Sequence, residues 1–482
     1  MFNFLEKNED SKECKVFLGS KELSKEETGE IKNPYTNEVV SIYPKCSAED
    51  AKEALEIAKE AFNTTKQTPL SQRIAWLEDV AKKLREKKDF FAKIIVDEVA
   101  KPLSFAKIEV ERCAETLELT AKELINLHGE TINTDATASG RKALAYYKRV
   151  PAGVVSAITP FNFPLNLVAH KIGPALGAGN AVVLKPTPEA PRTAYELVKL
   201  FVNSEYAIKD AISLVYGDAD VGGELVSSDI PRVVSFTGSV QVGKIIMKNA
   251  GIKKVALELG GNAATFIDKD ANLEDAAKKC AFGAFYNSGQ VCISLQRIYV
   301  YKSVYDAFAN ELANAAKDLK VGSPYEEDTF MGPLINEDAK LRAKSWVASA
   351  VDEGAKVLYG GKEIDGIFPP TVMIDVRDDM NIVCEEVFAP IVSLVKVDSY
   401  EEAIKKINDS PYGLQYSIFT NNLATAKSFI DDAECGGVVV NDIPTVRFDI
   451  QPYGGIKQSG IGKEGPKFAL EEYTEIKSVV IF

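Results

Sequence analysis

The sequence predicts an α/β protein of two or three domains whose parallel sheets are covered by helices on both faces. Short, continuously apolar runs typical of buried strands alternate with helical patterns along most of the chain. The length of 482 residues exceeds the roughly 250–300 residues beyond which one core usually divides into domains. In sheets of this kind the ligand binds at the carboxyl ends of the strands, so the residues that follow each strand decide the function.

The N-terminal part of the chain precedes the first regular alternation. Residues 1 to about 30 are polar and predict an irregular or loosely attached segment. A turn at 31–38 separates two strand-like runs at 16–18 and 39–42. The stretch from 47 to about 127 predicts helices, because apolar residues recur with the 3.6-residue period after a capping signal.

Two series of strands and helices follow. A strand at 142–150 ends at Pro151, and the first series then gives buried strands at 154–158, 181–184, 211–215, 233–236 and 255–258. The second series, from 271 to about 440, gives strands at 297–301, 357–359, 391–395, 417–419 and 437–440. The apolar run 478–482 predicts a terminal strand, which would promote aggregation unless another subunit pairs with it.

Composition and charge exclude several classes of function. The formal net charge is -13, so binding of nucleic acid or an anionic membrane by bulk electrostatics is not expected. The N-terminus has no apolar run typical of a signal peptide, and no stretch approaches the ~20 apolar residues that span a bilayer.

The cysteines and histidines argue for reduced thiols and against a metal site. The seven cysteines are odd in number, scattered and without a C-x-x-C pair, which predicts reduced thiols in a cytoplasmic protein. Only two histidines, His128 and His170, are present, so no zinc site of the usual spacing is expected.

Two glycine-flanked turns carry the strongest chemical signal. Glu258 lies in Ala-Leu-Glu-Leu-Gly-Gly-Asn (256–262), and Cys292 closes the turn Asn-Ser-Gly-Gln-Val-Cys (287–292). A thiolate is a strong nucleophile and a carboxylate can activate water, so together they can form and hydrolyse a covalent acyl-enzyme. Each alone also fits a structural role, as a buried ion-pair partner or an inert core thiol.

Three other strand ends carry polar candidates. Asn162, in 158–164, offers an amide donor to an oxyanion, or caps a turn. Lys185 can hold a ribose or phosphate, or lie at the surface. The glycine turn at 236–243 can receive a pyrophosphate at a helix N-terminus, although it is not the G-x-G-x-x-G fingerprint.

In combination, these motifs resemble the aldehyde dehydrogenase superfamily, over nearly the whole chain from Asn33 onward. The resemblance implies that Cys292 is the nucleophile, Glu258 the general base and Asn162 the oxyanion donor. It implies an NAD or NADP cofactor. The residues implied to bind it are Ile158, Thr159, Pro160, Phe161, Lys185, Gly222, Phe236, Gly238, Ser239, Gly243, Leu259, Glu386 and Phe388.

The choice between NAD and NADP stays open at this point. Members that prefer NAD often carry Glu three residues after the lysine, where this chain has Pro188, with Glu189 one position later. No metal is implied.

The residues of these motifs, by resemblance, imply a short hydroxylated aldehyde such as lactaldehyde as the substrate. A non-acylating enzyme of the family would oxidise it to the carboxylate. Succinate semialdehyde and glyceraldehyde-3-phosphate are alternatives, although Val291 stands where phosphate-binding members tend to carry Arg.

Three further residues, His170, Arg112 and Arg447, are expected to line the substrate funnel, or else to form ordinary surface or interdomain pairs. The glycine-rich loop 452–460 is given a structural role. The alternative from another class of function is a family member that binds ligands or has a structural role but does not catalyse a reaction.

The resemblance also implies the architecture: two doubly wound parallel-sheet domains and a small β oligomerisation arm. Residues 1–132 and 151–259 are expected to form the dinucleotide-binding domain and 260–455 the catalytic domain. The arm is expected from 133–150 and 466–482, and the chain to self-associate as a dimer or tetramer.

Overall fold

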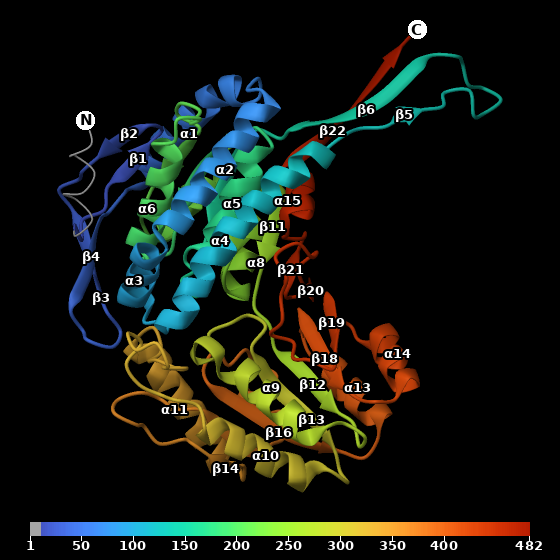
Figure 1. The fold of residues 1–482 in the computed structure, drawn as a ribbon. Coiled ribbons are helices and arrows are strands. Elements are labelled where there is room, and N and C mark those ends of the chain that lie inside the picture. Colours follow the sequence, from blue (N-terminus) through green and yellow to red (C-terminus); the bar gives the residue numbers. More distant parts are fainter. Residues whose placement is uncertain (1–10) are drawn as a thin grey trace.

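The structure, a computed structural model, describes residues 11–482 and contains two central sheets and a projecting β arm (Figure 1). This confirms the predicted fold class. The expectation about a signal peptide falls partly on residues 1–10, outside the described residues. Within residues 11–482, no helix is both long and apolar enough to cross a membrane.

The first sheet has eight strands, in the order β2-β1-β9-β8-β7-β10-β11-β21. Its five central strands are parallel, and antiparallel strands flank them at both edges. The strands are β2 (Lys21–Leu23), β1 (Val16–Leu18), β9 (Ile212–Leu214), β8 (Ala181–Lys185), β7 (Val154–Ile158), β10 (Pro231–Thr237), β11 (Lys254–Glu258) and β21 (Gly460–Ile461).

Helices pack around this sheet because each carries one apolar face. In α1, Ser47 and Asp50 form a capping box, and Ala51, Leu55 and Ala58 are buried at helical spacing. The helices are α1 (Ala48–Thr65), α2 (Leu70–Glu86), α3 (Lys88–Val99), α4 (Leu103–Glu123), α5 (Asn166–Gly177), α6 (Pro191–Val202), α7 (Ala219–Ser227) and α8 (Val240–Asn249).

The strand predicted at 16–18 is confirmed as β1, whereas the prediction that the segment before residue 30 is loosely attached is wrong for its described part. Strand β1 is fully buried because it pairs with β9 at the sheet edge. The next strands, β3 (Thr28–Lys32) and β4 (Val39–Pro44), form a hairpin with each other.

The second sheet has seven strands, in the order β14-β15-β16-β13-β12-β18-β19, parallel except for β14. They are β14 (Lys356–Tyr359), β15 (Thr371–Ile374), β16 (Ile391–Val397), β13 (Leu295–Tyr301), β12 (Ala263–Ile267), β18 (Gln415–Phe419) and β19 (Gly437–Val440). The accompanying helices are α9 (Leu273–Phe285), α10 (Tyr305–Lys317), α11 (Glu337–Asp352), α12 (Asn381–Cys384), α13 (Tyr400–Asn408) and α14 (Leu423–Asp432).

The arm projects from the body near the C-terminal end of the chain (Figure 1). It consists of β22 (Thr474–Ile481), β6 (Leu144–Pro151) and β5 (Thr131–Ile132), all antiparallel. Helix α15 (Pro466–Glu472) packs instead against α4 and α5. The predicted arm segment 466–482 therefore begins too early, because α15 buries Ala469 and Leu470 in the first body. The other predicted domain boundaries stay predictions.

Candidate active site

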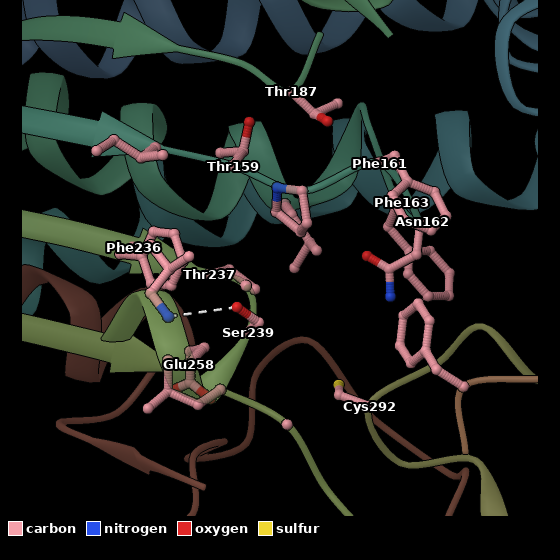
Figure 2. Close-up of a pocket in the computed structure, with 18 of the residues that line it drawn as sticks. Thr159, Phe161, Asn162, Phe163, Thr187, Phe236, Thr237, Ser239, Glu258 and Cys292 are labelled. Carbon is pink, nitrogen blue, oxygen red and sulfur yellow. Dashed lines mark hydrogen bonds between the residues drawn. The ribbon is translucent and has the colours of Figure 1, made fainter. Parts of the chain in front are cut away.

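A cavity of about 1010 Å³ lies where the carboxyl ends of β7, β10 and β11 face loops of the second body (Figure 2). The three residues predicted to be catalytic, Asn162, Glu258 and Cys292, all line it. They come from three separate segments, so the fold brings together side chains that are far apart in the sequence.

The turn before Cys292 has an unusual backbone. Asn287, Ser288 and Gly289 adopt φ angles of 51°, 57° and 71°, three consecutive residues in the left-handed region. For a residue other than glycine this conformation costs of order 1–3 kcal/mol and persists only where surrounding contacts fix it. One such contact is the hydrogen bond of 3.2 Å that the Asn287 amide donates to the main-chain carbonyl of Asn162. The turn thereby couples the predicted nucleophile to the predicted oxyanion donor.

The sulfur of Cys292 lies 2.9 Å from the hydroxyl oxygen of Tyr453. Burial raises the pKa of the Cys292 thiol to about 12, and the Tyr453 hydroxyl and the Arg447 guanidinium act in the opposite direction. The sequence analysis missed Tyr453, because it lies in the glycine-rich loop to which only a structural role was given. The one available signal was a phenol directly before two glycines.

Glu258 ends strand β11, where it pairs with Gly460 of β21. Its Oε2 atom is buried and has no hydrogen-bond partner among the described residues. Burial raises the pKa of this carboxyl well above its usual range, the Glu464 charge raises it further, and Lys171 opposes the shift. A buried carboxyl with a raised pKa and a free oxygen is suited to take a proton from water.

The side chain of Asn162 faces the same space as the Cys292 sulfur (Figure 2). Its Oδ1 atom is buried without a hydrogen-bond partner in the described part of the chain. The oxyanion donor would be the Nδ2–H group of this side chain, since Oδ1 can only accept, and the main chain that carries it is held by Lys101 and Asn287.

A buried ion pair fixes the Asn162 loop. The Lys101 ammonium is bonded to the Glu109 carboxylate, and both side chains are at most 1% exposed. Glu109 also accepts hydrogen bonds from the main-chain N–H groups of Leu165 (2.9 Å) and Asn166 (3.2 Å), which begin α5. The sequence analysis did not identify this pair, since both residues belong to a segment read only as helical.

The predicted substrate residues form one ion network. Arg112 donates two hydrogen bonds, of 2.9 and 2.8 Å, to the Asp449 carboxylate. Arg447 donates to Glu464 at 3.1 Å, and its Nη2 lies 3.2 Å from His170 Nε2. The two arginines line the cavity, and the carboxylates of Asp449 and Glu464 balance their charges.

His170 differs from the expectation that it lines the funnel. Its side chain is buried behind Arg447, and Nε2 also lies 3.0 Å from Asp449 Oδ1. Burial first, and then the Arg447 charge, lower the pKa of His170. The residue belongs to α5, whose whole length is buried, and so it contacts the arginine rather than the cavity.

The other half of the cavity fits a dinucleotide. The hydroxyls of Thr159 and Thr237 are buried without hydrogen-bond partners in residues 11–482, and both residues line the cavity. Ser239 caps the N-terminus of α8 because its hydroxyl oxygen accepts a hydrogen bond of 3.3 Å from the Val242 main-chain N–H, and this helix end favours an anion such as a pyrophosphate. Lys185 lines the same part of the cavity, where burial lowers its pKa.

Twelve of the thirteen predicted cofactor residues line this cavity: Ile158, Thr159, Pro160, Phe161, Lys185, Gly222, Phe236, Gly238, Ser239, Leu259, Glu386 and Phe388. Gly243 does not. A Cβ at Gly243 would lie 2.7 Å from the Leu259 side chain, so its place is the packing of α8 against Leu259.

Glu386 and Phe388 approach from the second body. The Glu386 carboxylate accepts a hydrogen bond of 2.9 Å from Gly261 N, and burial raises the pKa of Glu386 to about 7. Phe388 has a φ of 48°, and its ring meets that of Phe161 edge-on at 6.0 Å between centroids. No group of three or more potential metal ligands occurs in the described residues.

The remaining cysteines do not contribute to the cavity. Cys113 and Cys280 are buried, whereas Cys384 and Cys435 are half-buried. Cys384 is the last residue of α12, and Cys435 lies after the end of α14.

A family model described as the aldehyde dehydrogenase family matches residues 22–479. The chain belongs to the aldehyde dehydrogenase family. This aldehyde dehydrogenase is 42% identical to the 3-sulfolactaldehyde dehydrogenase of Priestia megaterium, over 94% of both chains. It is 40% identical to the lactaldehyde dehydrogenase of Methanocaldococcus jannaschii, over 97% of this chain and 100% of the relative.

A solved structure gives the same result for the fold. The glyceraldehyde-3-phosphate dehydrogenase GapN of Methanocaldococcus jannaschii, complexed with NADP, matches with a TM-score of 0.91 and 40% identity, over 95% of this chain and 100% of that one. The aldehyde dehydrogenase described here is therefore an NAD(P)-dependent enzyme, which confirms the predicted activity and cofactor class. The alternative of a catalytically silent family member is set aside.

Proposed function

We propose that this aldehyde dehydrogenase oxidises a short 2-hydroxy aldehyde, with lactaldehyde as the preferred substrate, to the carboxylate, and that water rather than coenzyme A releases the product. The observation that carries the proposal is the convergence of Cys292, Asn162 and Glu258 on one cavity with a compensated polar wall. Each of the three supplies one of the functions that thioester chemistry needs.

The geometry of these side chains supports the following roles. The Cys292 sulfur attacks the aldehyde carbon, and the Asn162 amide with the Cys292 main-chain N–H stabilises the oxyanion. The bound nicotinamide cofactor supplies the hydride acceptor. Glu258, with its unpartnered oxygen, then takes a proton from the water that hydrolyses the thioester. Lys185, Ser239 and Glu386 would hold the dinucleotide along the other half of the cavity.

The substrate class rests on the cavity wall and on the relatives. Lactaldehyde, 3-sulfolactaldehyde and glyceraldehyde-3-phosphate all carry a hydroxyl next to the aldehyde and differ in the group on the third carbon. In this chain Asp449 and Glu464 already compensate Arg112 and Arg447. Val291 precedes the nucleophile and adds no charge. These features favour an aldehyde whose third carbon carries no charged group, as in lactaldehyde, over one that carries a phosphate.

A panel of aldehydes tests the proposal. Reduced-nicotinamide absorbance is followed with lactaldehyde, propanal, 3-sulfolactaldehyde, glyceraldehyde-3-phosphate and succinate semialdehyde, each with NAD and with NADP. We expect kcat/KM to be highest for lactaldehyde and at least about tenfold lower for propanal, which lacks the hydroxyl. A higher value for an anionic aldehyde would contradict the substrate assignment. A reaction that stops after one turnover until coenzyme A is added would contradict hydrolysis by water.

We further propose that the arm pairs with another copy of the chain. Ile476, Val480 and Ile481 of β22 and Phe482 are between 51% and 89% exposed, a large apolar surface for a projecting strand. Light scattering is expected to give a multiple of the 52.6 kDa chain mass. Removal of residues 474–482 should then give monomers, and a full-length monomer would contradict the proposal.

A further inference from the structure

Tyr453 places a phenol hydroxyl against the predicted nucleophile. The distance between its oxygen and the Cys292 sulfur is 2.9 Å, and both residues line the cavity. Only 3% of the tyrosine is exposed. This hydroxyl is the hydrogen-bond partner that the described residues offer to the sulfur, so it acts directly on the reacting atom.

We propose that Tyr453 is a further catalytic residue, whose hydroxyl donates a hydrogen bond to the Cys292 sulfur and stabilises the thiolate that attacks the aldehyde. The proposal rests on the proposed role of Cys292 as nucleophile. The tyrosine keeps its proton throughout. The thiol proton leaves to water, the sulfur lone pair forms the bond to the carbonyl carbon, and the carbonyl electron pair moves to the oxygen that Asn162 faces.

The direction of this hydrogen bond follows from the surroundings of the phenol. A thiolate can only accept, so the tyrosine must be the donor. Burial and the neighbouring Cys292 hold the pKa of Tyr453 well above its usual range, which keeps the phenol protonated. Hydrogen bonds to charged groups are the stronger class, so the contact gains strength as the thiol ionises.

The phenol is held in place from two sides. The Arg447 guanidinium lies 3.8 Å from the centre of the Tyr453 ring, and Arg447 is itself bonded to Glu464. The main chain of Tyr453 also forms two hydrogen bonds with that of Glu464, of 3.1 and 2.6 Å. A donor fixed in this way need not reorganise when the thiolate forms.

The other charged groups that act on the sulfur divide by sign. Glu258, at the end of β11, and Glu386, in the loop after α12, disfavour the thiolate, whereas Arg447 favours it. Desolvation adds to the effect of the two carboxylates. Arg447 also pairs with Glu464, so its charge acts only partly on the sulfur. The Tyr453 hydroxyl, a neutral donor in direct contact with the sulfur, is therefore the group best placed to offset the effects of the two carboxylates and of desolvation.

The test measures the ionisation of Cys292 without substrate or cofactor. Cys384→Ser and Cys435→Ser first remove the other partly exposed thiols. Iodoacetamide alkylation of Cys292 is then followed against pH by mass spectrometry. Tyr453→Phe is expected to raise the apparent pKa of alkylation by about one or more, which is the size of a hydrogen bond to a charged group.

Two comparisons separate this effect from a general disturbance. Tyr286→Phe removes another phenol hydroxyl from the same cavity, one that makes no hydrogen bond to the sulfur, and should leave the alkylation profile unchanged. Replacement of Tyr453 by 3-fluorotyrosine keeps the shape and strengthens the donor, so it should lower the apparent pKa. An unchanged profile in folded Tyr453→Phe, or in the fluorotyrosine protein, would overturn the proposal.

Turnover provides a second readout. In Tyr453→Phe, kcat/KM should fall at neutral pH and recover towards alkaline pH, whereas a merely structural role would lower it equally at all pH values. Cys292→Ala tests the proposed function by itself. If that variant still oxidises aldehydes, the nucleophile assignment fails whatever the alkylation profile of the tyrosine variants.

Discussion

The buried ammonium group of Lys101 donates a hydrogen bond of 2.7 Å to the main-chain carbonyl of Asn162. The same carbonyl accepts from Asn287, in the turn before Cys292. One main-chain oxygen therefore links a helix-start lysine, the predicted oxyanion donor and the turn of the predicted nucleophile. The positions of the reacting groups depend on an ion pair that does not line the cavity.

Replacement of Lys101 by methionine should destabilise the protein and slow the reaction. It leaves Glu109 buried without its cation, which typically costs about 3–5 kcal/mol. Urea unfolding and kcat measure the two effects. Lys107→Met, on the exposed side of α4, is the matched control and should change neither. Equal unfolding midpoints for Lys101→Met and the wild type would contradict the anchoring role.

Replacement of Asn162 by alanine should lower kcat by roughly 10²–10³ while cofactor binding persists, because one oxyanion donor is lost. Stopped-flow absorbance checks this by following the first turnover, which contains the attack on the aldehyde. Asn162→Asp, which places a negative charge beside the oxyanion, should be slower still. A first turnover at the wild-type rate in Asn162→Ala would exclude the amide from the reaction.

The hydrolysis step should accelerate as pH rises. Burial and Glu464 hold the pKa of Glu258 well above that of an ordinary carboxyl, so its basic form accumulates at higher pH than that of an exposed glutamate. Glu258→Gln should release one equivalent of reduced cofactor per site and then stop, without this pH dependence. Glu258→Asp keeps a base and should retain a slower, pH-dependent turnover. Continuous turnover by Glu258→Gln would contradict the prediction.

Acid should destabilise the protein through His170. Its folded pKa is lowered by burial and Arg447, so below about pH 6.5 the unfolded chain binds more protons than the folded one. The free energy of unfolding then falls by at most about 1.4 kcal/mol per pH unit from this group. His170→Gln should remove that part of the slope, whereas His128→Gln, at an exposed site, should keep it. Identical slopes in both variants would refute the assignment.

The adenosine end of the cavity should favour NAD over NADP. Lys185 faces three carboxylates there, those of Asp218, Glu189 and Asp220, and Glu189 is held by a hydrogen bond from Thr187. A 2'-phosphate would add two further negative charges to this group. Glu189→Gln is expected to tighten NADP binding about tenfold and to leave NAD binding nearly unchanged, as measured by titration of protein fluorescence. Tighter binding of NADP than NAD by the wild type would contradict this.

The sequence predicted the central strands well, and the three residues that it proposed as catalytic line one cavity, because each lies within a contiguous signature. The runs 154–158 and 437–440 are continuous apolar segments, and they are strands β7 and β19. Strand β12 was missed because Ala263 and Ala264 at its start are weakly strand-forming, although the strand is fully buried. Its state is decided by β13 and β18 on either side, which no local pattern contains.

The same limit applies to the site. Glu258 and Cys292 lie in glycine-flanked motifs, whereas Tyr453, Lys101 and the burial of His170 depend on which distant segments meet. Asp449, which joins Arg112 to His170, lies 337 positions from the first and 279 from the second. Contacts between residues so far apart are set by the topology of the chain, and they leave no local pattern in the sequence from which they could be predicted.

The pairing of Glu258 with Gly460 has a consequence for movement. The chain leaves β11 for the second body directly after Glu258 and returns to pair with the same strand at β21. The main chain of Leu259 is also bonded to Ser459 at 2.9 Å. Because β11 and β21 belong to the same sheet of the first body, the outgoing and the returning connection to the second body lie side by side, next to Glu258. We therefore expect any movement between the two bodies to act through these neighbouring connections and to shift the Glu258 carboxyl relative to the loops of the second body.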